Sequence, residues 1–187
     1  MSTLNEGLIN EIMERNARIT ASNGVHVAEH CEPGKNPMTE TLIRCLMEST
    51  EGVFSTMCGW EMECGTPSRH DGFAPRHDVS GIIGLTGAIK ATIVVSVDED
   101  LVYAVAESIL GERPKSINGD VVDLVGELAN MIGGNAKERL SVPNVVLGLP
   151  TVVAGTGHYV AYNSHMLVTM VPFQCQHGSM SIELGIV

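Results

Sequence analysis

Apolar residues along this chain recur either every three to four positions or at alternate positions, and these two spacings predict helices and strands respectively. Helical spacing marks Leu4 to about Ala17, Met38 to Met57, a short helix between an N-cap at Asp98 and a C-terminal Gly111, and a long helix over 118–137. Alternating or β-branched runs predict strands at 60–64, 79–85, 88–97, 145–154, 159–162, 165–173 and 179–187.

The segment from Asn118 to Lys137 has the sharpest division between apolar and polar positions. At about 100° per residue, one stripe of this helix is apolar and the opposite stripe is polar. The apolar stripe therefore belongs to the core, and the polar stripe faces water or a partner. The two stripes are Val121, Val125, Leu128 and Ile132 on one side, and Asp123, Glu127, Asn130 and Gly134 on the other.

Three glycines in this helix need an explanation, because each weakens a helix by about 1 kcal/mol relative to alanine. One explanation is close packing against another helix or the sheet. A second is that small residues let a partner approach Glu127 and Asn130, and a third is that Gly133 and Gly134 end the helix. The small-residue flank in question consists of Gly126, Ala129, Gly133 and Ala136.

The order of elements predicts an α+β fold. About six strands joined by short turns favour an antiparallel or mixed sheet, with two long helices packed on one face. We expect residues 38–187 to form this domain and residues 1–37 to form a helical arm and linker. The arm is either a poorly ordered terminus or a device for self-association.

Composition narrows the functional classes. The chain has a formal net charge of −11, and 44% of its residues are hydrophobic. Such a charge argues against binding to nucleic acid or an anionic membrane as the main role, because phosphate contacts need clustered lysine and arginine. No apolar run approaches the ~20 residues of a membrane span, and no signal peptide is recognisable. We expect a soluble, cytoplasmic protein.

The cysteines and histidines of the chain do not match the spacing of common catalytic or metal sites. The five cysteines are an odd number without C-x-x-C spacing, so a disulfide framework, a zinc ribbon and a recognisable cysteine nucleophile are all disfavoured. The seven histidines show no H-E-x-x-H spacing, so we expect surface histidines and no metal site. The histidines considered as ligands, two of them beside aspartates, are His70, His77, His158, His165 and His177.

The pattern Asp123-x-x-x-Glu127-x-x-Asn130, set in this glycine-bearing helix, resembles the signature of the CheX branch of the CheC, CheX and FliY chemotaxis phosphatases. A bare E-x-x-N is weak, but its helix and the order of elements make it more specific. Supporting matches lie at 53–61, 78–85, 93–97 and 149–153, and the resemblance covers about 41–187. Only one E-x-x-N is present, as in CheX.

The resemblance implies hydrolysis of the aspartyl phosphate on a CheY-like response-regulator receiver domain. Asn130 would orient the attacking water, and Glu127 would pair with the receiver's conserved lysine. No cofactor is expected on this chain, because Mg²⁺ would belong to the receiver. The resemblance also implies a homodimer joined through its sheet. Further expected partner-binding residues are Asp123, Gly126, Gly133, Gly134 and Lys137.

Two other functions remain open at this stage. The chain could be a non-catalytic module that docks on a receiver or a flagellar-switch protein, since all the chemistry rests on two residues. A weaker alternative is a small-molecule sensor that uses the loop expected at 66–78.

Overall fold

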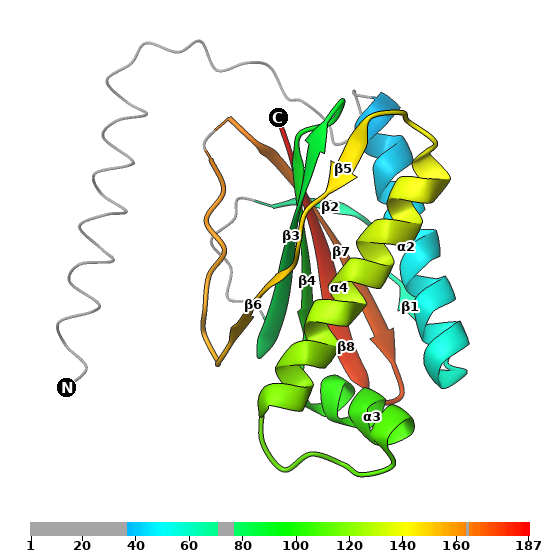
Figure 1. The fold of residues 1–187 in the computed structure, drawn as a ribbon, viewed down its shortest axis with the longest axis vertical. Coiled ribbons are helices and arrows are strands. Elements are labelled where there is room, and N and C mark those ends of the chain that lie inside the picture. Colours follow the sequence, from blue (N-terminus) through cyan, green and yellow to red (C-terminus); the bar gives the residue numbers. More distant parts are fainter. Residues whose placement is uncertain (1–36, 71–76, 164) are drawn as a thin grey trace, which may run out of the picture. The chain divides into compact units, whose positions relative to one another are not determined.

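Helices cover one face of an antiparallel sheet in the computed structural model, which describes residues 37–70, 77–163 and 165–187 (Figure 1). The strand order is β1-β7-β8-β4-β3-β5, and every pairing is antiparallel, with β2 also on β7 and β6 also on β3. The helices are α2 (Pro37–Cys58), α3 (Glu99–Leu110) and α4 (Gly119–Leu140). The strands are β1 (Glu63–Cys64), β2 (Ser68–His70), β3 (Val79–Gly87), β4 (Ala91–Val97), β5 (Val145–Leu147), β6 (Thr151–Ala154), β7 (Leu167–Cys175) and β8 (Gly178–Ile186).

The core lies between the sheet and the helices. The register pairs Ile83 with Ile93 and Val95 with Ile182. Because alternate residues of a strand point to the same face, the side chains of these pairs lie together on the face that the helices cover. These four side chains are at most 1% exposed. The arrangement confirms the predicted α+β fold with two long helices on one face, and the strand pairings show that the sheet is antiparallel.

Helix α4 is the 118–137 helix predicted from the sequence, extended by three residues to Leu140. The Asn118 side chain accepts a hydrogen bond from the Val121 backbone N–H at 3.1 Å, so Asn118 is the N-cap of the helix. The helix continues through both adjacent glycines and ends where Ser141 adopts a left-handed conformation. The alternative in which Gly133 and Gly134 end the helix is therefore wrong.

Helix α3 begins and ends as predicted. The Asp98 side chain accepts a hydrogen bond from Leu101 N–H at 2.8 Å, and Gly111 closes the helix with φ of 81°. The same carboxylate also accepts a hydrogen bond from Ser179 N–H at 2.6 Å. One aspartate therefore caps α3 and fastens it to β8.

Two segments differ from the sequence-based prediction around the edges of the sheet. Residues 145–154 form two strands, because the chain turns at Gly148, whose N–H donates to Gly84 C=O at 2.8 Å, and then meets Pro150. Ser68–His70, expected as part of a loop, forms β2 because it pairs with β7. The described strands therefore number eight instead of about six.

The predicted strand at 159–162 is wrong, and side-chain contacts explain the actual path of the chain there. Tyr162 Oη donates to the buried Glu183 carboxylate at 2.8 Å, and His158 Nε2 lies 2.7 Å from Ser80 Oγ. These contacts fasten residues 158–162 to β8 and β3 without any strand pairing. Half-buried His158 is therefore a structural residue and not the surface histidine that the sequence suggested.

The predicted arm and linker at 1–37 lie, but for Pro37, outside the described residues, as does most of the 71–78 part of the expected loop. Within the described residues, no helix is long and apolar enough to cross a bilayer.

Candidate functional site

The polar stripe of α4 carries the candidate catalytic pair. Asp123, Glu127 and Asn130 are all exposed, while the apolar stripe behind them is buried, as the sequence predicted. Side chains three residues apart on a helix have Cβ atoms about 5–6 Å from each other, so Glu127 and Asn130 are neighbours. Neither has a hydrogen-bond or ion-pair partner among the described residues. A carboxylate and an amide are thus displayed together, available to another molecule.

The glycines of α4 are explained by packing within this chain. A Cβ placed on Gly126 would lie 3.4 Å from Val152 Cγ2, and one on Gly133 would lie 3.2 Å from Leu147 Cδ1. Both glycines are buried, and so are Ala129 and Ala136 of the same flank. The close-packing explanation is therefore confirmed.

This packing bears on the predicted partner-binding set. Gly126 and Gly133 are buried and face β6 and β5 of their own chain, so their packing serves to seat α4 on the sheet. Gly134 and Lys137 are half-buried and lie further along the polar stripe toward the helix C-terminus. Asp123, Gly134 and Lys137 remain candidates for contact with a partner.

An apolar surface beside the candidate pair was not anticipated from the sequence. Leu149, in the turn between β5 and β6, is 92% exposed. The next residue, Pro150, has its Cγ 3.8 Å from where a Cβ on Gly126 would lie, so this turn adjoins the Glu127 turn of α4. The hydrogen bond of Gly148 to Gly84 and the packing of Pro150 on α4 therefore hold an exposed leucine near the Glu127 turn.

Elsewhere in the described residues, the groups considered for chemistry do not form a reactive site. Burial raises the pKa of the Cys45, Cys58 and Cys64 thiols above the ordinary value, which disfavours the reactive thiolate. No three His, Cys, Asp or Glu side chains of the described part of the chain gather closely enough to hold a metal ion. The fully buried Ser80 next to His158 has no exposure through which a substrate could reach it.

Comparison with known proteins places this chain in a family. The family model described as "Chemotaxis phosphatase CheX" matches residues 79–174, a range that contains all of α4. The CheY-P phosphatase CheX of Thermotoga maritima is 25% identical over 121 residues, which cover 63% of this chain and 78% of that protein.

Solved structures show the same fold. A CheC-like superfamily protein from Shewanella sp. PV-4 superposes with a TM-score of 0.74 at 33% identity, covering 79% of this chain and 97% of that one. The structure of a CheX–CheY–BeF₃–Mg²⁺ complex from Borrelia burgdorferi superposes with a TM-score of 0.65 at 20% identity, covering 78% and 97% respectively, a likeness of fold alone. Together with the family model, which spans about half of the residues and the whole motif helix, these matches show that this chain belongs to the CheX family of chemotaxis phosphatases.

Proposed function

We propose that this chain is a phosphatase that hydrolyses the aspartyl phosphate of a CheY-like receiver domain. The observation that carries the proposal is the exposed pair on α4, Glu127 and Asn130, in a chain of the CheX family. The similar protein of Thermotoga maritima is a CheY-P phosphatase, and the Borrelia burgdorferi protein of the same fold is found in complex with CheY. Both the activity and the partner class follow from these likenesses.

Hydrolysis of an aspartyl phosphate requires little from this chain beyond placing the attacking water correctly. In an acyl phosphate, water attacks phosphorus and the bond from phosphorus to the aspartyl oxygen breaks, giving inorganic phosphate and a free carboxylate. Placing the water in line can supply much of the acceleration. The Asn130 amide can accept a hydrogen bond from this water and donate one to a phosphoryl oxygen without changing its charge.

Glu127 is proposed to hold the complex in register. Its exposed carboxylate has no cationic partner among the described residues and can pair with the lysine of the receiver's phosphorylation site. The Mg²⁺ is proposed to be bound by the receiver, so this chain need only approach it. Asp123, one turn earlier, and Lys137, two turns beyond Asn130, would make outer contacts.

Exposed Leu149 adds contact area to the same surface. Burying an exposed leucine against a partner stabilises a complex by about 1.5–3 kcal/mol, whereas an isolated surface carboxylate contributes less. We therefore assign affinity for the receiver mainly to the turn between β5 and β6, and chemistry to α4. This division predicts different kinetic effects for the two regions.

The direct test is a dephosphorylation assay against the receiver domains of the host, each phosphorylated with a small-molecule phosphodonor. One receiver or a few should lose phosphate much faster with this protein than alone, and the others should not. Binding to a receiver without any change in the lifetime of its phosphate would favour the non-catalytic docking module instead.

Two further features implied by the family resemblance remain proposals. A homodimer would have twice the monomer mass of 19.9 kDa, which light scattering on the full chain measures directly. A cytoplasmic location would be seen by fractionating the host cells.

A further inference from the structure

Helix α2 contains a glycine that nothing in the described structure explains. Gly52 lies in the middle of this 22-residue helix, and a Cβ placed on it would meet no atom within 4 Å. Its cost to the helix is about 1 kcal/mol relative to alanine. Gly126 and Gly133 of α4 differ, because their missing side chains make room for β6 and β5. The open space over Gly52 is available to a molecule that is not part of this chain.

Gly52 lies in the floor of a hollow of about 690 Å³. One side of the hollow is a stripe of α2, whose residues recur at helical spacing, and the other is the segment 60–62 that follows the helix. Its lining residues are Glu48, Glu51, Gly52, Ser55, Trp60, Glu61, Met62 and Arg139.

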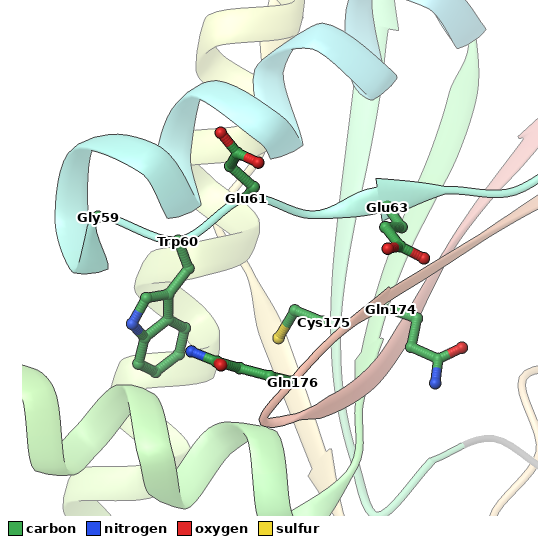
Figure 2. A pocket seen from close by; sticks show the side chains of 7 residues that line it. All are labelled: Gly59, Trp60, Glu61, Glu63, Gln174, Cys175 and Gln176. Atoms are coloured by element: carbon green, nitrogen blue, oxygen red, sulfur yellow. The ribbon is translucent and has the colours of Figure 1, made fainter.

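A second hollow of about 630 Å³ adjoins the first, because Trp60 and Glu61 line both. Figure 2 shows Trp60, Glu61 and Glu63 on one side of this second hollow and residues from the end of β7 on the other. We call the two hollows together the Trp60 groove. The remaining lining residues of the second hollow are Gly59, Gln174, Cys175 and Gln176.

The charge of the Trp60 groove is negative. Among the described residues, Arg139 is the one cationic side chain that lines it, and it lies 3.0 Å from Glu48, which neutralises it. Glu51, Glu61 and Glu63 have no ion-pair partner among the described residues. They do not converge on a point, since the described residues contain no group of three ligands that could hold a metal ion. A ligand that matches these carboxylates is therefore extended and carries separate positive charges.

Trp60 indicates which cationic group fits best. The indole is half-buried, and its ring packs against His177 with the centroids 4.0 Å apart and the ring planes tilted by 30°, so the indole is held in place. A guanidinium group stacks on an indole face and pairs with carboxylates through two parallel hydrogen bonds, whereas an ammonium group does neither as well. The groove therefore matches arginine better than lysine.

We propose that the Trp60 groove docks an arginine-bearing segment of a protein partner, whose backbone passes over Gly52. The open glycine lets the backbone approach, Trp60 stacks on an arginine side chain, and Glu51 and Glu61 pair with its charge. None of the residues that line the groove belongs to the polar stripe of α4, so this docking site is distinct from the proposed phosphatase site.

The fluorescence of Trp60 can report binding to the groove, because Trp60 is the only tryptophan in the 187 residues. The full-length protein is titrated with a capped heptapeptide in which arginine and glycine alternate, and indole emission is recorded. We expect a saturable change. Gly52→Leu should raise the dissociation constant roughly tenfold, a loss of about 1.4 kcal/mol, by blocking the backbone. Because its side chain enters open space, it should also raise the melting temperature.

Matched variants separate the groove from general attraction to an acidic protein. Glu51→Gln should weaken binding about two- to fivefold, whereas Glu112→Gln, an exposed glutamate in the loop after α3, should have no effect. Gly119→Ala, at an open glycine at the start of α4, should leave binding unchanged. Equal weakening by both glutamine variants, unchanged binding in Gly52→Leu, or equal binding of spermine and of the arginine peptide would each overturn the proposal.

Discussion

Gly81 of β3 lies so close to Ala129 of α4 that a Cβ on Gly81 would come within 2.8 Å of the Ala129 Cβ, and within 3.0 Å of the Val125 carbonyl oxygen. Ala129 directly precedes Asn130 and is fully buried. The backbone of the sheet therefore supports the helix at the turn that displays Glu127 and Asn130. A rigid support of this kind is what positional catalysis requires.

Gly81→Ala is expected to destabilise the fold by about 1–3 kcal/mol, because helix backbone and a buried Cβ cannot move aside for the added methyl group. Urea denaturation measures the loss. Gly84→Ala is the matched control on the same strand, since a Cβ there meets nothing within 4 Å. Equal stability of the two variants would contradict the close approach of β3 to α4.

Leu149→Ala should weaken binding to the cognate receiver. The side chain is 92% exposed, so its truncation should change the free energy of unfolding by less than about 0.5 kcal/mol. If it packs on the receiver, KM for the phosphorylated receiver should rise about tenfold or more while kcat is kept. A normal KM would remove the turn between β5 and β6 from the interface.

Glu127→Gln should weaken the complex through loss of an ion pair with the receiver's lysine. We expect a higher KM at low salt, with the difference from wild type shrinking as ionic strength rises, because salt screens exposed charges. Steady-state dephosphorylation at two salt concentrations measures this. Glu112→Gln, which removes the same charge away from α4, should behave as wild type, and a salt-independent defect would argue against an ion pair.

The phenol of Tyr103 should make the free energy of unfolding depend on pH in the alkaline range. Burial, together with the hydrogen bond that its hydroxyl donates to Glu99, raises the pKa of Tyr103 from 10.0 to about 12. The folded state therefore keeps a proton that the unfolded chain loses near pH 10. Stability associated with this group is complete below pH 10 and is lost progressively as pH rises to about 12.

Tyr103→Phe should remove that part of the alkaline loss, as measured by urea denaturation between pH 9 and pH 12, at roughly unit intervals. Tyr159→Phe, at a tyrosine that is 56% exposed, should retain the wild-type dependence on pH. The same slope in wild type and Tyr103→Phe would show that the phenol is not protected by burial.

The sequence predicted the exposed stripe of α4 because helical periodicity alone assigns residues to opposite faces. Local signals also sufficed for α3, where Asp98 and Gly111 are the caps. Helical periodicity does not show which element packs against the small-residue flank of α4. It could therefore not decide whether the glycines at 126 and 133 faced the sheet or a partner.

The segments whose structure was predicted wrongly share a cause, since the structure of each depends on contacts between residues that are distant in the sequence. Residues 159–162 have β-forming side chains, yet Tyr162 is held by Glu183 on β8. The polar Ser68–His70 forms a strand only because β7 lies beside it. A glycine at position 148 can be read from the sequence, but its hydrogen bond to Gly84, which breaks the strand there, cannot.

The most direct measurement is the rate at which the cognate phosphorylated receiver loses phosphate in the presence of Asn130→Ala. We expect the stimulated rate to fall at least about 100-fold, to near the receiver's own rate, with an unchanged melting temperature. Asn135→Ala, an exposed asparagine on the same helix outside the polar stripe, should retain full activity. Stimulation by Asn130→Ala within about twofold of wild type would contradict the claim that the Asn130 amide positions the attacking water.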